Sequence, residues 1–170
     1  MMENNYRYTL ELYRWAQELG IPFIYASSAA TYGAHQEFIE DVRYEGPLNV
    51  YGYSKYLFDQ VLRRELKSLR APVIGLRYFN VFGQRQDPYG AYAAVIPQWF
   101  AALTKGDTVY VNGDGETSRD FCYIDNVVQA NLLASYAADD ARNLVYNVAF
   151  GQRTTLNELF GLIRDEVVRH

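Results

Sequence analysis

Tyr51 and Lys55 are the residues of this sequence whose types and spacing most clearly indicate chemistry. They lie four positions apart at the start of a stretch with helical apolar spacing, so their side chains share one helix face. A phenol has a reference pKa of about 10, too high for a base at neutral pH, and a nearby ammonium group lowers it. The pair therefore predicts a general acid/base. The alternative interpretation is an ordinary tyrosine and lysine on a solvated helix face, which is a common arrangement.

A feature upstream of this pair favours the chemical interpretation. The apolar run 21–25 predicts a short buried strand, of the kind found in parallel sheets. It leads into the small hydroxyl residues Ser28 and Thr31 and then into a glycine turn at Gly33. The sequence thus predicts a strand that ends in a hydroxyl group, followed by a helix that carries the acid/base pair.

Together these motifs resemble the extended short-chain dehydrogenase/reductase family, in its NAD-dependent nucleotide-sugar epimerase and dehydratase branch, over essentially the whole chain. The resemblance implies that NAD is the cofactor and that Ser28, Tyr51 and Lys55 are catalytic. Tyr51 would take the proton from the sugar 4-hydroxyl, Ser28 would orient that hydroxyl, and Lys55 would hold the nicotinamide ribose. The residues that the resemblance places at the cofactor are Asn5, Ala26, Ser27, Tyr51, Lys55 and Tyr78.

The resemblance also implies a site for a nucleotide-sugar substrate, formed by the second half of the chain. An Asn80 that leaves a strand end can reach a ligand, because open α/β sheets bind ligands beyond the carboxyl ends of their strands. The small residues of 90–97 leave room for a bulky sugar substituent. A guanidinium at Arg119 can grip a diphosphate through paired hydrogen bonds. The substrate residues implied are Asn80, Ala94, Val95, Tyr110, Asn112 and Arg119.

Each of these motifs also has a purely structural interpretation. Asn80 could cap a turn, since asparagine favours such positions. The segment 90–97 could be a plain junction between a loop and a helix. Arg119 could form a surface salt bridge with Asp120. We keep these alternatives open at this point.

The two halves of the sequence resemble different substrate classes. Residues 1–80 are most similar to ADP-glycero-manno-heptose 6-epimerases, and residues 77–160 to UDP-N-acetylglucosamine 4-epimerases of polysaccharide biosynthesis. In the heptose enzymes a second lysine follows the motif that ends in Asn80, whereas this chain has Tyr89 at about that place. We therefore expect a UDP-N-acetylglucosamine/UDP-N-acetylgalactosamine 4-epimerase. The alternatives are an ADP-heptose 6-epimerase and a catalytically silent domain of the same family.

The elements that position these residues alternate between helix and strand, which indicates an α/β fold. We expect helices over 3–19 and 51–68, a surface loop over 34–49 and a loop over 80–92. Gly20 is a natural stop for the first helix, and Thr155 and Glu158 fit a capping box that opens the last one. Strands are expected at 21–25, 73–79, 108–111 and 145–148. The expected architecture is a partial doubly wound, Rossmann-like parallel sheet without its first strands, plus a small substrate-binding α/β lobe. Residues 1–80 would form the remaining half of the NAD-binding domain. Residues 81–170 would form mainly the lobe, with strands that return to the Rossmann-like sheet.

The glycine-rich turn Gly-x-x-Gly-x-x-Gly, which binds the cofactor pyrophosphate in this family, does not occur among the 170 residues. By resemblance the chain starts partway through the Rossmann domain, and four leading strands are missing. The sheet would then have an open apolar edge, which invites pairing with another chain. The helices 3–19 and 51–68 match those that form the dimer interface in the family, so a homodimer is expected.

Composition sets wide limits on the class of protein. An apolar content of 49% and a charged content of 21% are typical of a globular domain. The net charge of −4 gives no reason to expect nucleic acid or an anionic membrane as a partner. The single cysteine, Cys122, excludes an internal disulfide and argues against a cysteine-based metal site. With no signal-peptide pattern or long apolar run, a cytoplasmic protein is expected.

Overall fold

The structure is a computed structural model that describes residues 1–90 and 92–169. The chain forms two compact units. The first comprises residues 1–79 and 126–148, and the second comprises residues 80–125 and 149–170. The first unit therefore combines residues 1–79 with the later segment 126–148, whose residues 145–148 join its sheet. Ala91, within the expected substrate loop 90–97, lies outside the described residues.

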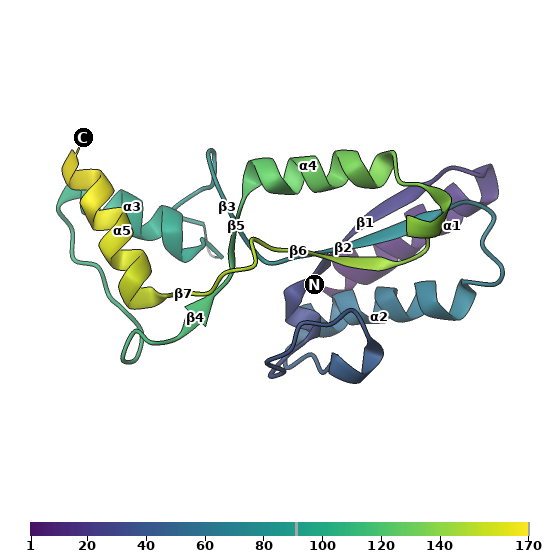
Figure 1. Ribbon diagram of the computed structural model, residues 1–170, viewed down its shortest axis with the longest axis horizontal. Helices are drawn as coiled ribbons and strands as arrows, with labels where there is room; N and C mark the ends of the chain where they lie inside the picture. The colour runs from purple at the N-terminus through teal and green to yellow at the C-terminus, as the bar shows by residue number, and fades with distance from the viewer. Residues whose placement is uncertain (91, 170) are drawn as a thin grey trace. The chain divides into compact units, whose positions relative to one another are not determined.

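The first unit is built on a parallel sheet with the strand order β1-β2-β6. These strands are β1 (Phe23–Ser28), β2 (Val73–Tyr78) and β6 (Val145–Val148). Figure 1 shows α2 (Val50–Glu65) on one side of this sheet and α4 (Ile124–Ser135) on the other. Helices that cover both faces of a parallel sheet make it a buried layer, as the sequence predicts. The predicted α/β class with a Rossmann-like parallel sheet is confirmed.

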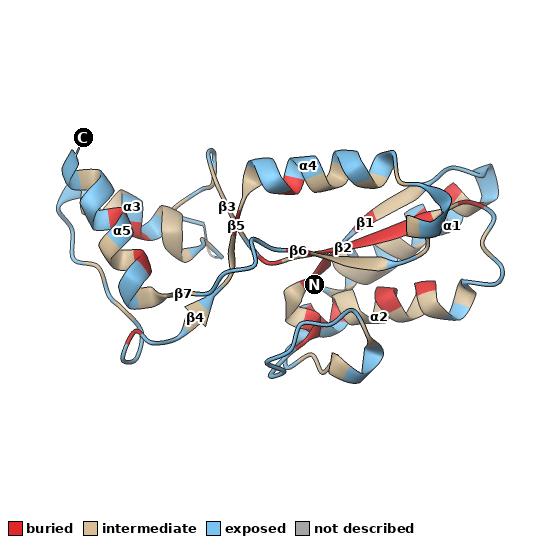
Figure 2. Cartoon of the chain, viewed as in Figure 1, coloured by how far each residue is buried: buried red, intermediate tan, exposed pale blue. Residues whose placement is uncertain are grey.

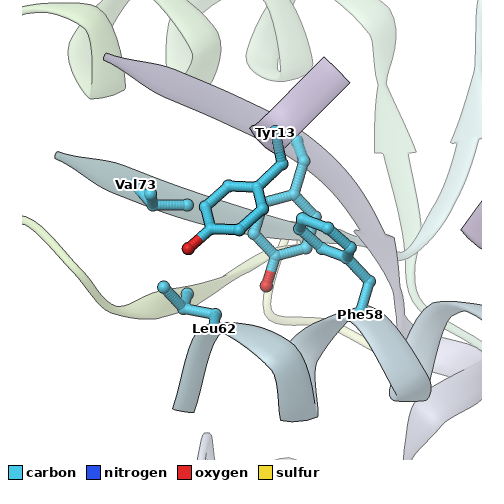
Figure 3. Close-up of a cluster of buried hydrophobic side chains, with 5 residues drawn as sticks. Tyr13, Phe58, Leu62 and Val73 are labelled. Atoms are coloured by element: carbon cyan, nitrogen blue, oxygen red, sulfur yellow. The ribbon is translucent and has the colours of Figure 1, made fainter. Parts of the chain in front are cut away.

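The core of this unit lies between the sheet and two helices, α1 (Tyr8–Leu19) and α2. Figure 3 shows side chains from α1, α2 and β2 meeting there. The buried members are Tyr13, Tyr25, Phe58, Leu62 and Val73. Figure 2 shows the same burial along β2 and on one face of α2. Because both helices contribute aromatic rings to one cluster, α2 is held firmly over β1 and β2.

The predicted helix 3–19 is present, but its first turn is a π-helix, Glu3–Arg7, that precedes α1. Gly20 ends α1 in the left-handed conformation with φ of 69°, the role that glycine plays most easily. The predicted strand 21–25 forms two residues later in the sequence, as β1. Local signals thus locate these elements and misplace their ends by a few residues.

The second unit contains two helices and two small sheets. Trp99 of α3 (Val95–Lys105) packs against Leu159 and Ile163 of α5 (Leu156–Arg169). The strands β3 (Asn80–Phe82) and β5 (Phe121–Tyr123) pair in parallel. The strands β4 (Ser118–Arg119) and β7 (Thr154–Thr155) pair antiparallel.

Two sequence predictions about the second unit are wrong. Residues 108–111 form no strand, because no other segment pairs with them among the described residues. The expected loop 80–92 begins instead with β3, which is specified by its distant partner β5. The expected surface loop 34–49 is present: it has no α-helix or strand, and most of it is exposed. It contains a 3₁₀ turn, Val42–Tyr44, and the side chain of Glu45 is its buried exception. No helix among the described residues is long and apolar enough to cross a bilayer.

Candidate active site

Ser28 is the last residue of β1 and starts the 3₁₀ turn Ala29–Thr31. Its hydroxyl oxygen accepts a hydrogen bond of 3.2 Å from the backbone N–H of Ala30. The hydroxyl of Thr31 donates to the Ser28 carbonyl at 2.8 Å. These two bonds close the turn over the strand end, so the Ser28 side chain has a fixed position at the carboxyl edge of the sheet.

Tyr51 lies in the first turn of α2, and the start of that helix packs directly on the turn after Ser28. Asn49 caps the helix, because its side-chain oxygen accepts a bond of 2.8 Å from the Gly52 N–H. A Cβ on Gly52 would lie 2.6 Å from the Ala30 carbonyl oxygen, so only glycine permits this approach. Tyr51, of which 38% is exposed, therefore lies where α2 meets the strand end.

Lys55 lies one helical turn after Tyr51 and bridges α2 to β1. Its ammonium group donates a hydrogen bond of 2.9 Å to the carbonyl oxygen of Ala26. Burial lowers the pKa of Lys55, while the carboxylate of Asp59 acts in the opposite direction. The structure thus brings Ser28, Tyr51 and Lys55 to the same end of β1, as the sequence predicts for neighbouring functional groups.

The other expected cofactor residues have defined structural partners in the first unit. The Ser27 hydroxyl is buried and donates to Asp59 at 3.0 Å. Tyr78 is opposite Ser28 in the sheet register, and its hydroxyl is bonded to Asn131 of α4 at 2.9 Å. Burial raises the pKa of Tyr78, and the bond to Asn131 lowers it. Asn5 lies in the π-helical turn, which packs against α2.

The expected substrate residues all lie in the second unit. Both the backbone N–H and the side-chain amide of Asn80 donate to the carbonyl oxygen of Asp120, at 3.2 and 2.9 Å. Asn80 is thereby held beside Arg119, the residue before Asp120. The Asp120 carboxylate accepts bonds from the backbone N–H groups of Phe150 and Gly151 at 2.8 and 2.7 Å. It is therefore engaged by backbone, in contrast to the surface salt bridge with Arg119 considered above.

The remaining substrate candidates are dispersed over this unit. Ala94 is the residue before α3, and Val95 is its first residue. Tyr110 and Asn112 lie in the segment between α3 and β4, and 80% of Tyr110 is exposed. Arg119 is exposed, and its guanidinium donates to the neighbouring Ser118 carbonyl at 2.9 Å. Side chains so exposed are available to a ligand of this unit.

A buried group of charged residues next to Lys55 was missed by the sequence analysis. Arg77 and Asp59 are both fully buried and are paired at 2.7 Å. The side chain of Glu45 is also fully buried and pairs with Arg77 and with Arg63. An arginine inside an otherwise apolar strand is a signal that could have revealed this group, because a buried charge requires a partner. No His, Cys, Asp or Glu cluster suited to a metal ion occurs in the described part of the chain.

The chain resembles known proteins in sequence. It is 45% identical over 165 residues to an ADP-L-glycero-D-manno-heptose-6-epimerase of Pseudomonas aeruginosa strain UCBPP-PA14. That match covers 94% of this chain and 49% of the relative. The chain therefore spans about half the length of the curated relatives it matches.

Solved structures show the same fold. The UDP-N-acetylglucosamine 4-epimerase of Methanobrevibacter ruminantium is 36% identical with a TM-score of 0.88; the match covers 96% of this chain and 52% of that one. The ADP-L-glycero-D-manno-heptose-6-epimerase of Helicobacter pylori is 34% identical with a TM-score of 0.88, covering 98% of this chain and 51% of that one. The backbone of this chain thus follows epimerases of two substrate classes equally well.

The family model for the NAD dependent epimerase/dehydratase family matches residues 1–149. This match contains the end of β1, the start of α2 and the end of β2, where the candidate residues meet. On this match the chain belongs to the NAD dependent epimerase/dehydratase family.

Proposed function

We propose that this chain carries the proton-transfer residues of an NAD-dependent nucleotide-sugar epimerase. The observation that carries the proposal is the bridge from Lys55 to the Ala26 carbonyl, one helical turn from Tyr51 and at the end of the strand that Ser28 completes. Ammonium, phenol and alcohol groups placed at one strand end are the set that a reversible proton transfer at a sugar hydroxyl requires.

Each of the three side chains has a distinct role in this proposal. Tyr51, as the phenolate, removes the proton from the sugar 4-hydroxyl and later returns it. Lys55 stabilises the phenolate by its charge, and Ser28 orients the sugar hydroxyl by hydrogen bonding. NAD, when bound, would supply the redox chemistry of reversible hydride transfer at the sugar carbon. The protein contributes position and proton transfer.

The residues present fit one end of this cofactor. An ammonium group has three donors, and Lys55 uses one of them on Ala26, which leaves donors for the hydroxyls of a nicotinamide ribose. Tyr78 lies across from Ser28 at the same sheet edge. The glycine-rich turn for the pyrophosphate is not among the 170 residues. We therefore expect the purified chain to carry no NAD; a nucleotide assay on denatured protein that finds one NAD per chain would contradict this expectation.

For the substrate we favour UDP-N-acetylglucosamine and its 4-epimer. The support is the small residues of 90–97, the exposed Tyr110 and Arg119, and Tyr89 in place of a second lysine. The known UDP-N-acetylglucosamine 4-epimerase with the same backbone fold is consistent with this choice. The exposed Arg119 would bind the diphosphate, and Tyr110 would stack on the base.

A second candidate substrate is ADP-glycero-manno-heptose, favoured by the 45% identity to a heptose epimerase. Ligand-observed NMR with the purified chain separates the two. We expect UDP-N-acetylglucosamine to bind more tightly than the ADP-heptose, and Arg119→Ala to weaken binding while the equally exposed Arg164→Ala does not. Tighter binding of the ADP-heptose would reverse the choice, and a silent domain would bind without any turnover.

The catalytic assignment is tested by Tyr51→Phe. General acid/base catalysis contributes about 10²–10⁴-fold, so the variant should lose at least 10²-fold of the epimerisation measured with NAD added. Tyr53→Phe, two positions away and similarly exposed, is the matched control and should retain the rate. An unchanged rate in Tyr51→Phe would exclude this residue as the base.

We also propose that the chain forms a homodimer through helices 3–19 and 51–68. The outer face of α1 supports this, because it carries exposed apolar side chains at one-turn spacing. They are Tyr8, Leu12, Trp15 and Leu19. A contiguous apolar stripe of this kind marks an interaction surface.

A further inference from the structure

Asp59 has an unusual environment for a carboxylate. It is fully buried in α2 and accepts four hydrogen bonds. Its donors are the hydroxyls of Tyr25 at 2.8 Å and Ser27 at 3.0 Å, and the Nε and Nη2 atoms of Arg77 at 3.1 and 2.7 Å. None of these three partners takes part in the proton transfer proposed above, and the hydroxyl of Ser27, expected at the cofactor, is bonded to Asp59 instead, so the group requires an explanation of its own.

We propose that Asp59 is a positioning residue. It holds α2 against β1 so that the ammonium group of Lys55 can reach the Ala26 carbonyl and Tyr51 lies next to the turn after Ser28. The inference rests on the function proposed for Lys55 and Tyr51. Asp59 itself touches neither substrate nor cofactor in this account, and it acts through Lys55.

The spacing of three residues on α2 is the first observation that supports this role of Asp59. Tyr51, Lys55 and Asp59 follow one another at four-residue spacing, so they lie along one face of the helix. On β1, Tyr25 and Ser27 flank Ala26 and point to the same face of the sheet, since strand side chains alternate. Asp59 therefore bonds the residues on either side of the one that Lys55 bonds. Hydrogen bonds thus hold two consecutive turns of α2 against three consecutive residues of β1, 25–27; we call this set of contacts the clamp.

Arg77 on β2 completes the clamp. It donates to Asp59 and to Glu45, and Glu45 also pairs with Arg63. Two guanidinium groups thus face two carboxylates. Burial raises the pKa of Asp59, and the charge and hydrogen bonds of Arg77 act in the opposite direction. Arg77 precedes Tyr78, whose partner in the sheet register is Ser28. The network thereby joins the three segments that carry the proposed site.

Gly75 on β2 provides the space that these contacts need. A Cβ on Gly75 would lie 2.6 Å from the Tyr25 ring, so glycine is needed for the phenol to lie across the strand and reach Asp59. Buried ion pairs can often be replaced by apolar side chains without loss of stability. A contribution to stability therefore does not explain this arrangement well. A requirement for a defined spacing between α2 and β1 explains it better.

The charge of Asp59 also acts on Lys55. The groups that face Lys55 are Tyr51 and Asp59 on α2 and the carbonyl of Ala26 on β1, with Arg77 behind Asp59 on β2. Burial lowers the pKa of Lys55 and Asp59 opposes that shift. Loss of the carboxylate charge should therefore lower the pKa of Lys55 further, so that less ammonium is present to stabilise the phenolate of Tyr51.

The test is an NMR titration of the lysine ammonium groups in the 170-residue chain. The sequence contains only three lysines, so Lys55 is assigned by its loss in Lys55→Arg, and Lys67 and Lys105 are internal references. In Asp59→Asn we expect the midpoint of Lys55 to shift to lower pH while the references stay in place. The control Glu11→Gln removes an exposed carboxylate of the same unit and should leave Lys55 unchanged.

A second variant keeps the test valid if Asp59→Asn does not fold. Tyr25→Phe preserves every charge and removes one donor to Asp59. We expect the ammonium hydrogens of Lys55 to exchange with water faster in this variant, because α2 is held less firmly over Ala26. Unchanged titration in Asp59→Asn, or unchanged exchange in Tyr25→Phe, would overturn the inference.

The outcome is separable from that of the proposed function. If Lys55 responds to Asp59 but Tyr51→Phe leaves epimerisation intact, the proposed function fails and the positioning result stands. If Tyr51→Phe abolishes epimerisation but the titration midpoint of Lys55 is unchanged in Asp59→Asn, only the inference about Asp59 fails.

Discussion

Gly52→Ala sets two effects of one added methyl group against each other. Within a helix the change normally stabilises, because alanine exceeds glycine in helix propensity by about 1 kcal/mol. At this position, however, the new Cβ would lie 2.6 Å from the carbonyl oxygen of Ala30 and 3.1 Å from the Cβ of Pro47. The Ala30 oxygen belongs to the backbone and cannot rotate away, and overpacking of this kind costs about 1–3 kcal/mol. We therefore expect Gly52→Ala to bring no gain in stability and a net loss of up to about 2 kcal/mol.

Gly161→Ala provides the matched control. Gly161 lies within α5, and an added Cβ there would meet no atom within 4 Å. The same substitution should therefore stabilise by about 0.5–1 kcal/mol. Urea unfolding followed by circular dichroism measures both free energies of unfolding. If Gly52→Ala gained as much stability as Gly161→Ala, α2 would not pack on the turn after Ser28 and the site would lose its structural basis.

Three further predictions concern the core, the buried charges and the dimer. Phe58→Ala should cost about 3–5 kcal/mol in urea unfolding, because the ring fills the cluster between α1, α2 and β1; a loss below 1 kcal/mol would contradict this packing. Burial raises the pKa of Glu45, but hydrogen bonds from the neighbouring arginines outweigh it and lower that pKa overall. Glu45 therefore contributes stability that is fully present above its unfolded value of about 4.3 and is lost as the pH falls through the lower folded value. Glu45→Gln should cost about 3 kcal/mol at pH 7 and less at pH 3, since Arg77 loses one of two carboxylate partners; an equal cost at both pH values would refute this. Trp15→Glu should shift sedimentation from dimer towards monomer, whereas the exposed Val168→Glu on α5 should not; a monomeric wild-type chain would exclude the interface.

The sequence predicted those parts of the structure that depend on neighbouring residues. Gly20 ends α1, and Thr155 and Glu158 form a reciprocal capping box at α5, with bonds of 2.8 and 3.1 Å. The residues 73–78 form the buried central strand, because a continuous apolar run is specific to that environment. Helix periodicity, a local rule, placed Tyr51 and Lys55 on one helix face, whereas resemblance to the family joined Ser28 to that pair.

Long-range pairing explains what the sequence did not reveal. The strand β3 has only three residues, and it exists because β5, some forty positions later, lies beside it. Residues 108–111 have strand-like composition but lack such a partner among the described residues. Glu45 lies in a stretch of charged residues that resembles a surface loop, yet Arg63 and Arg77 draw it into the interior. Burial of a charge is decided by partners from other elements, which no local pattern encodes.

The most direct test of the proposed function is a crystal structure of the chain with bound UDP-N-acetylglucosamine. The phenolic oxygen of Tyr51 should lie about 2.6–3.2 Å from the sugar 4-hydroxyl, the range that direct proton transfer requires. Ser28 should contact the same hydroxyl. A sugar bound with that hydroxyl turned away from Tyr51 would exclude Tyr51 as the group that removes its proton.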